Sequence, residues 1–342
     1  MSGEALKGVM IGAGYFAQYQ AEAWLRTEGA RIVAVADAAP GRAEEFAERW
    51  QISRVYQNTA EMLERERPDF VDIATRPESH PELVRLAARH GAHVICQKPM
   101  APSWEECLAM VNACAEANVR LFIHENWRWQ PWFREIKRLL DQGAAGKPFY
   151  ASFVMRNSDG RGAEPYQLQP YLREMERMLV YEMIVHFLDT FRFLMGEIKS
   201  VFCQTRRVNP VIKAEDHTLI QLAFENGACG LIDANRISGP ARREPISEEL
   251  IVEGDRGKIR LARDCRIWID EYGNGERLRD YDFPVEGYRG DSVHATQQHF
   301  ISCLQTGERC ESDGEDYLKT AAAVFACYES AETGQAVSLP LK

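Results

Sequence analysis

Short apolar runs alternate with amphipathic segments along the first third of the chain. The runs have the length of buried strands, and they lie at 9–11, 32–36, 70–74, 92–96 and 119–123. Segment 81–90 places its apolar residues on one helical face and ends at Gly91. Because strands that alternate with helices usually form a parallel sheet, residues 1–124 are predicted to form a doubly wound α/β domain.

The pattern changes after residue 124. Helical periodicity is expected at 131–141, 292–305 and 314–333, and at 171–195 as one long helix or two abutting ones. Strand-like alternation is expected at 148–156, 198–207, 217–224, 229–237, 249–254, 258–261 and 266–270. Asn226-Gly227 lies between two of these strands, which is typical of a hairpin turn. Residues 125–342 are therefore predicted to form an α+β domain with a large, open, mainly antiparallel sheet.

Composition and charge restrict the possible partners. The 342 residues are 45% hydrophobic and 27% charged, as in a globular protein of two domains. A net charge of −10, with acidic residues spread along the chain, argues against nucleic acid or an anionic membrane as partner. No apolar run approaches the ~20 residues of a membrane span, and MSGEALKG does not resemble a signal peptide. A cytoplasmic location is expected.

The nine cysteines show no pairing pattern. Their number is odd, no C-x-x-C occurs, and several lie in apolar surroundings, among them Cys96 and Cys327. These features predict buried free thiols in a reducing compartment. No His/Cys spacing fits a zinc site, so no metal is expected.

The strongest chemical motif is a glycine turn. Gly12-x-Gly14-x-x-Ala17 follows the first strand and opens a helix, and Asp37 ends the next strand. Gly12 permits the tight turn, Gly14 lets the backbone approach a pyrophosphate, and Ala17 lets the helix pack closely. Asp37 would bind the ribose hydroxyls and repel a 2′-phosphate. The motif in this context therefore predicts a dinucleotide site that favours NAD over NADP.

Two further groups are candidates for binding or catalysis. Lys98 follows a buried strand at the carboxyl edge of the predicted parallel sheet, where ligands of doubly wound folds bind. Glu182 and His186 are four residues apart in an apolar helical stretch, so they share one face. A histidine can accept a proton near neutral pH. The alternatives are that Lys98 is only a solvated residue at a strand end, and that His186 is a structural histidine with Glu182 as a helix-surface acid.

Together these pieces resemble the glucose–fructose oxidoreductase / inositol dehydrogenase / rhizopine-catabolism (Gfo/Idh/MocA) family of dinucleotide-dependent sugar enzymes. The resemblance covers nearly the whole chain. It is carried by GAGYFA at 12–17, DIATRPESH at 72–80, Lys98-Pro99, Asn126-x-Arg128, Gly143-x-x-Gly146-Lys147-Pro148, Glu182-x-x-x-His186-x-x-Asp189 and Tyr328-Glu329-Ser330-Ala331-x-Thr333-Gly334. Gln97 departs from the family pattern, which usually has an acid there, and Glu182 stands where Asp is more common.

The resemblance implies an N-terminal Rossmann domain and NAD-dependent oxidation of a sugar or polyol hydroxyl. It implies that His186 takes the hydroxyl proton, Lys98 stabilises the oxygen, and Glu182 orients substrate and base. The implied cofactor-binding residues are Gly12, Gly14, Tyr15, Phe16, Ala17, Asp37, Thr75, His80, Gln97, Lys98 and Arg128. The implied substrate-binding residues are Lys98, Arg156, Glu182, His186 and Arg236.

One more stretch of sequence limits the range of expected substrates. HENWRWQPW at 124–132, together with Gln97, resembles family members that act on aldoses such as D-apiose. One rival is an inositol-type cyclic polyol. Another is an enzyme that retains NAD and uses transient sugar oxidation for elimination or hydrolysis. A non-catalytic sugar sensor is disfavoured because Lys98 and His186 are both present. A homodimer or homotetramer through the C-terminal sheet is expected, since an open sheet face needs cover.

Overall fold

The computed structural model describes residues 5–240 and 245–341, which form two compact units. Unit 1 contains the chain up to Trp129 and residues Pro284–Ala321, and unit 2 contains Gln130–Phe283 and the chain from Ala322 onward. Helix α9 (Gly314–Thr333) begins in unit 1 and ends in unit 2. Residues 284–321 thus group with the N-terminal part of the chain, although the sequence suggested a single division after residue 124.

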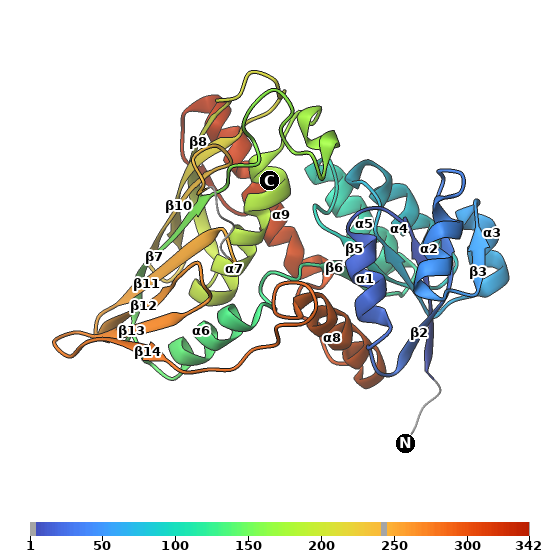
Figure 1. The fold of residues 1–342 in the computed structure, drawn as a ribbon, viewed down its shortest axis with the longest axis horizontal. Helices are drawn as coiled ribbons and strands as arrows, with labels where there is room; N and C mark the ends of the chain where they lie inside the picture. The colour runs from blue at the N-terminus through green and yellow to red at the C-terminus, as the bar shows by residue number, and fades with distance from the viewer. Residues whose placement is uncertain (1–4, 241–244, 342) are drawn as a thin grey trace. The chain divides into compact units, whose positions relative to one another are not determined.

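A six-stranded parallel sheet lies at the centre of unit 1, in the order β3-β2-β1-β4-β5-β6 (Figure 1). Its strands are β1 (Leu6–Ile11), β2 (Ala30–Ala36), β3 (Arg54–Tyr56), β4 (Phe70–Ile73), β5 (His93–Gln97) and β6 (Leu121–His124). The predicted doubly wound parallel sheet is confirmed. Strand order reverses between β1 and β4, which is where ligands bind in folds of this kind.

Helices cover both faces of this sheet. One face presents Met10, Val35 and Phe70 to a core that includes Phe46 of α2 and Phe300 of α8. Helices α3, α4 and α5 contact the sheet or one another on the other face. The unit 1 helices are α1 (Ala17–Trp24), α2 (Arg42–Trp50), α3 (Thr59–Glu66), α4 (His80–Arg89), α5 (Trp104–Glu116) and α8 (Ser292–Thr306).

A nine-stranded sheet forms unit 2, in the order β14-β13-β12-β11-β7-β10-β9-β8-β15. All neighbours are antiparallel except β7 and β10, so the expected mainly antiparallel sheet is confirmed. Its strands are β7 (Pro148–Arg156), β8 (Ile198–Arg206), β9 (His217–Phe224), β10 (Cys229–Asn235), β11 (Glu248–Gly254), β12 (Gly257–Leu261), β13 (Ile267–Glu271), β14 (Gly275–Arg279) and β15 (Val337–Ser338). Strands β14 and β15 were not foreseen.

The two faces of this second sheet have different surroundings. Helices α6 (Pro131–Asp141) and α7 (Val185–Met195) lie on the inner face, where Phe153 of β7 stacks on Phe187 at 4.6 Å. Residues on the inner face are fully buried and their neighbours along each strand are only partly buried, as in Phe153/Val154, Ile220/Leu219, Ile232/Leu231 and Leu250/Ile251. Among the residues described, no helix covers the outer face.

Segment 171–195, predicted as one long helix or two abutting ones, contains more than one helical piece in the structure. A short 3₁₀ helix covers Pro170–Arg173, an irregular segment follows, and a π-helix covers Leu179–Ile184 immediately before α7. The buried carboxylate of Glu215 accepts the backbone N–H groups of Met178 (3.4 Å) and Val180 (3.0 Å). These bonds fix where the helix begins, and no periodicity in the sequence could reveal them.

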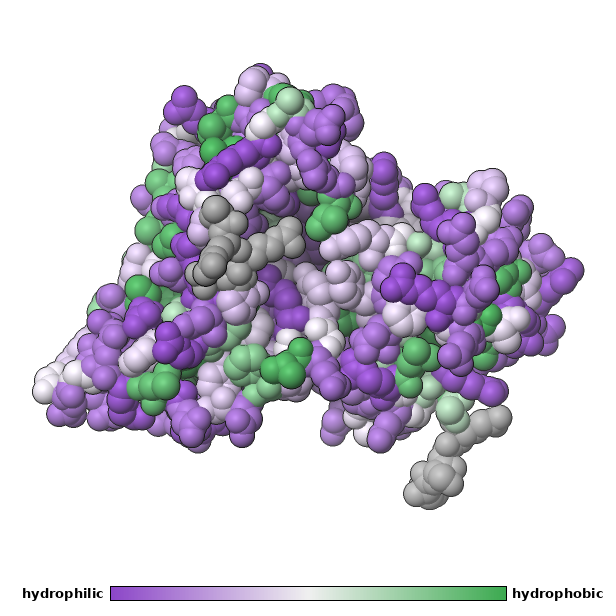
Figure 2. All heavy atoms as spheres, in the orientation of Figure 1, coloured by the Kyte–Doolittle hydropathy of each residue, from purple (hydrophilic) through white to green (hydrophobic). Residues whose placement is uncertain are grey.

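The surface drawn in Figure 2 is mainly hydrophilic, as expected from charged residues that are spread along the whole sequence. Hydrophilic residues cover most of the face drawn in Figure 2, and hydrophobic residues form only small groups on it. Within the described part of the chain, none of the helices combines the length and apolarity needed to cross a bilayer.

Candidate active site

The backbone of the glycine turn in unit 1 is open to close approach by a ligand. Gly12 has φ +100°, and a Cβ there would lie 2.6 Å from the carbonyl oxygen of Ala74. A Cβ on Gly14 would meet nothing within 4 Å, so this backbone faces open space. The turn leads into α1, and the first N–H groups of a helix have no intrahelical partner. These features fit a bound pyrophosphate.

Asp37 shapes the same turn. Its Oδ2 accepts the N–H of Ala13 at 2.8 Å and its Oδ1 accepts the N–H of Ala39 at 2.8 Å. Each carboxylate oxygen can accept a second hydrogen bond, so the side chain keeps capacity for ribose hydroxyls. The residue therefore has two jobs, since it also holds the glycine turn in place.

Gln97 and Lys98 follow one another at the carboxyl end of β5. Gln97 is 5% exposed, and its Nε2 has no hydrogen-bond partner among the described residues. A buried amide donor without a partner costs about 1–3 kcal/mol, so a ligand oxygen is the natural complement. Lys98 is half-buried at the same sheet edge. Both residues lie where the sequence places them.

A buried acid that was not among the predicted site residues, Glu125, lies on the strand end next to that of Lys98. Glu125 follows β6 as Lys98 follows β5, and these strands pair in parallel with Gln97 opposite His124. The Glu125 carboxylate is fully buried, with Oε1 accepting the N–H of Trp127 and Oε2 accepting the hydroxyl of Tyr317, both at 3.1 Å. The positive charge of Lys98 acts on this carboxyl, although position 97 holds an amide.

The protonation of Glu125 is balanced near neutrality. Burial raises the pKa of Glu125 to about 7, against the opposing effects of the Trp127 N–H, the Lys98 charge and the Tyr317 hydroxyl. A carboxyl with such a pKa changes charge in the pH range in which most enzymes work. Perturbed groups of this kind cluster at functional sites.

His80 supports the chain on both sides of the site. Its Nδ1 lies 3.1 Å from the carbonyl oxygens of both Pro99 and Met100, and its Nε2 lies 3.2 Å from that of Thr75. Burial lowers its pKa, although these carbonyls favour the protonated ring. The side chain is fully buried and connects the ends of β4 and β5. The Thr75 hydroxyl accepts a bond from Ser79 at 2.7 Å.

Other predicted cofactor contacts lie nearby in unit 1. Tyr15 is 44% exposed, and Phe16 packs edge-on against His124 with ring centroids 6.3 Å apart. Arg128 is buried with Nη1 3.8 Å from a carboxylate oxygen of Glu311. All remain candidates, because each lies in the glycine turn or just beyond β6.

In unit 2, Glu182 and His186 lie where the π-helix meets α7. Glu182 is half-buried, and His186 is 3% exposed. Tyr328 donates its hydroxyl to Glu215 at 2.6 Å and accepts the N–H of Tyr181 at 3.1 Å. The start of this helix is therefore held by a buried carboxylate and a tyrosine, and π-helical turns often occur at functional sites.

Arg236 joins Glu182 on the inner side of unit 2. Its guanidinium pairs with Asp159 and lies 4.3 Å from the ring centre of Tyr166. Burial disfavours its charge, yet the Asp159 pair, Tyr166 and Glu182 leave the pKa of Arg236 raised. The buried cation is thus fixed close enough to Glu182 for their charges to interact.

Arg156 lies elsewhere. Its guanidinium pairs with the carboxylate of Asp233. It also donates a hydrogen bond to the backbone carbonyl oxygen of Asp233 at 2.7 Å. Both residues alternate with inner-face residues along β7 and β10, so they lie on the outer sheet face, opposite α7. The structure does not bring Arg156 together with Glu182 and His186.

Glu125 could have been found from the sequence, but Glu215 could not. Glu125 directly follows an apolar run, as Lys98 does, and that position is a usable signal. Glu215 bonds Val180 across 35 residues and Tyr328 across 113.

Comparison with known proteins gives consistent results. Residues 6–125 match the family model described as "Oxidoreductase family, NAD-binding Rossmann fold", and residues 133–260 match "GFO/IDH/MocA C-terminal domain". D-apiose dehydrogenase of Rhizobium rhizogenes is 38% identical, across 98% of this chain and 97% of that protein. Myo-inositol 2-dehydrogenase of Thermotoga maritima is 27% identical, across 96% and 97%. The crystal structure of an oxidoreductase from Agrobacterium radiobacter in complex with NAD⁺, L-tartaric acid and magnesium has a TM-score of 0.91 at 36% identity, across 97% and 98%.

Proposed function

The chain belongs to the Gfo/Idh/MocA family of NAD-dependent oxidoreductases, and we propose that it oxidises an aldose, D-apiose or a close analogue, to the lactone. The observation that carries this substrate is the similarity to D-apiose dehydrogenase over 98% of the chain. The HENWRWQPW stretch and Gln97 support the same choice. An inositol-type polyol is the second candidate, supported by the related myo-inositol 2-dehydrogenase.

The cofactor site is proposed to lie at the carboxyl edge of the unit 1 sheet. Gly12, Gly14 and the start of α1 would hold the pyrophosphate, Asp37 the adenosine ribose, and the Gln97 amide a further ligand oxygen. The open space at Gly14 and the unsatisfied Gln97 donor support this fit. A bound NAD supplies the acceptor for the hydride that leaves the substrate carbon.

We propose that two side chains handle the hydroxyl group. His186 accepts its proton as a neutral imidazole, and the Lys98 ammonium stabilises the negative charge that develops on the oxygen. Glu182 binds substrate hydroxyls or orients the imidazole. Arg236 supports Glu182 because its charge is close and fixed by Asp159.

Glu125 is proposed to set the charge around Lys98. As a carboxylate it balances the ammonium, so the cation need not be buried without a counter-charge. As a neutral acid it leaves the positive charge uncompensated. The bonds from Trp127 and Tyr317 hold the carboxyl in place for this role.

We propose an assembly and a location from the outer sheet face and the cysteines. The outer face of the unit 2 sheet carries partly buried apolar side chains, including Leu219, Leu231 and Ile251. A second copy of the chain would cover them, so we expect a homodimer or homotetramer. Free, mostly buried cysteines suit a reducing, cytoplasmic compartment. Light scattering after size exclusion tests the assembly, and a monomer would contradict it.

The function is tested by NADH formation from NAD with D-apiose, other aldoses and inositols. We expect the highest kcat/KM with D-apiose or another aldose. Activity with inositols and none with aldoses would transfer the assignment to the cyclic polyols. Sugar conversion without added NAD and without net NADH would instead indicate transient oxidation for elimination or hydrolysis.

A further inference from the structure

A cluster of soft metal ligands lies in unit 1, and none of its three residues is among the proposed cofactor-binding or substrate-binding residues. His299 and Cys303 are four residues apart on α8, and Cys310 lies in the connection between α8 and α9. One ligand atom from each lies within 4.8 Å of the others, and both cysteines are buried. Cys303 Sγ lies 3.5 Å from His299 Nε2.

The connection that carries Cys310 is fixed by Arg120. This guanidinium donates to the carbonyl oxygens of Cys303 (2.8 Å), Gly307 (2.6 Å) and Glu308 (2.7 Å). These bonds close the end of α8 and return the chain toward Cys303. A contact between residues distant in sequence therefore brings the three ligands together. Their spacing, H-x₃-C-x₆-C, is not one of the usual zinc motifs, so the sequence alone did not indicate a site.

The imidazole is already in the protonation state that binds a metal. His299 Nε2 accepts the N–H of Glu311 at 2.9 Å, so this nitrogen carries no proton. Trp129 packs against the ring with centroids 4.6 Å apart and restricts its rotation. A metal would replace the amide hydrogen as the partner of the nitrogen lone pair.

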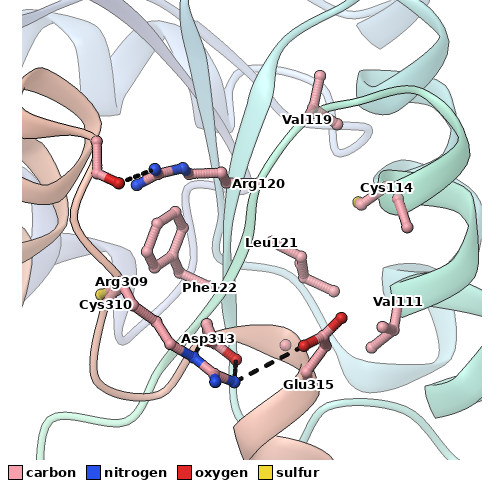
Figure 3. A pocket seen from close by; sticks show the side chains of 13 residues that line it. Val111, Cys114, Val119, Arg120, Leu121, Phe122, Arg309, Cys310, Asp313 and Glu315 are labelled. Carbon is pink, nitrogen blue, oxygen red and sulfur yellow. Dashed lines mark hydrogen bonds and ion pairs between the residues drawn. The ribbon is translucent and has the colours of Figure 1, made fainter.

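The cluster borders a cavity. Cys310 lines a space of about 420 Å³ between β6, α5 and the α8–α9 connection, together with Arg120, Leu121 and Arg309 (Figure 3). One of the three ligand residues thus lies at the edge of a space that is large enough to hold solvent.

We propose that His299, Cys303 and Cys310 bind a thiophilic divalent cation, Zn²⁺ in the first instance. Ligand atoms around tetrahedral zinc lie about 3.3–3.8 Å apart, given bonds of about 2.0–2.3 Å, so small side-chain movements suffice. Binding forms two Zn–S bonds and one Zn–N bond and releases both thiol protons to solvent. Two thiolates neutralise the ion, which then ties the end of α8 to the following connection.

The test uses the full chain, reduced and freed of metal, titrated with Zn²⁺ against a chromophoric chelator. We expect one tight equivalent in the wild type, and its loss in Cys310→Ser and His299→Ala. The matched control is Cys203→Ser, because Cys203 and Cys327 form a second buried thiol pair that no third ligand joins among the described residues. Cys229→Ser, at an exposed thiol, controls for surface binding.

Two further readouts keep the test independent of folding defects. Co²⁺ should give the intense visible bands of tetrahedral coordination with thiolate charge transfer, in the wild type and in both controls. Zn²⁺ should raise the thermal unfolding midpoint of the wild type and leave that of Cys310→Ser unchanged. No tight equivalent in the wild type, equal uptake by the cluster variants, or an octahedral cobalt spectrum would each overturn the proposal.

Discussion

Glu125 in unit 1 and Glu215 in unit 2 are both buried, and each accepts a hydrogen bond from a tyrosine of α9, Tyr317 and Tyr328 respectively. Their remaining surroundings differ. Glu125 has a nearby ammonium and a pKa of about 7, whereas Glu215 accepts two backbone N–H groups at the start of a helix. The same pair of residue types is thus proposed to adjust charge in one unit, and it bonds the start of a helix in the other.

The largest effects are expected at the two side chains proposed to handle the hydroxyl group, Lys98 and His186. Lys98→Ala and His186→Ala should each lower kcat by roughly 10³-fold or more, because they remove the charge and the base on which the proposed chemistry depends. Steady-state NADH formation measures this. Circular dichroism of each variant is the control for folding, and near wild-type turnover in either variant would remove that residue from the mechanism.

The next largest effect tests the charge of Glu125. Glu125→Gln keeps the shape and should lower kcat/KM by about 10-fold to 100-fold, since the carboxylate no longer balances Lys98. The ionisation near pH 7 should disappear from the pH dependence of kcat/KM. Tyr317→Phe, which keeps the carboxyl, is the milder comparison. A lowered kcat/KM with an unchanged pH profile would leave Glu125 only a structural role.

Glu215 should show the opposite behaviour. Glu215→Gln loses charge-assisted bonds to Val180 and Tyr328, so the free energy of unfolding should fall by about 1–3 kcal/mol. Urea unfolding measures it. The pH dependence of kcat/KM should keep its wild-type shape, and a shifted profile with unchanged stability would reverse the roles of the two glutamates.

A smaller effect is expected at Asp37. Asp37→Asn retains an acceptor for the Ala13 N–H but removes the charge, so discrimination against NADP should weaken by about 10-fold. Kinetics with both dinucleotides measure the ratio. Asp37→Ala should lose stability as well, and an unchanged ratio in Asp37→Asn would contradict the role of this carboxylate in cofactor choice.

The smallest effect concerns a third buried acid, Asp72, which bonds only neutral donors, Gln20 (2.7 Å) and Trp24 (2.6 Å). Burial raises its pKa from 3.8 to about 7. Between these values the folded chain holds a proton that the unfolded chain releases, so this group's contribution to stability is lost as pH rises.

Asp72→Asn should remove that part of the pH dependence and change stability by only about 1 kcal/mol near pH 5. The Gln20 amide can turn to accept from the new amide, because its Oε1 has no partner among the described residues. Unfolding curves across pH 4–8 for both proteins provide the comparison, and parallel curves would contradict the raised pKa.

The elements that could be predicted from the sequence are those that a short stretch of residues determines by itself. The glycine turn, Lys98 and Asp37 follow strands, and an apolar run reveals a strand without knowledge of its neighbours. Strand β14 is largely exposed, so it lacks the alternation that reveals a strand. The start of the π-helix depends on Glu215 and Tyr328, which are distant in sequence.

Net transfer of hydride from a sugar carbon to NAD can be followed with D-apiose deuterated at the anomeric carbon and mass spectrometry of the cofactor formed. We expect one deuterium in each NADH and one lactone or aldonate per NADH. Unlabelled cofactor, or sugar conversion without accumulation of NADH, would contradict this transfer.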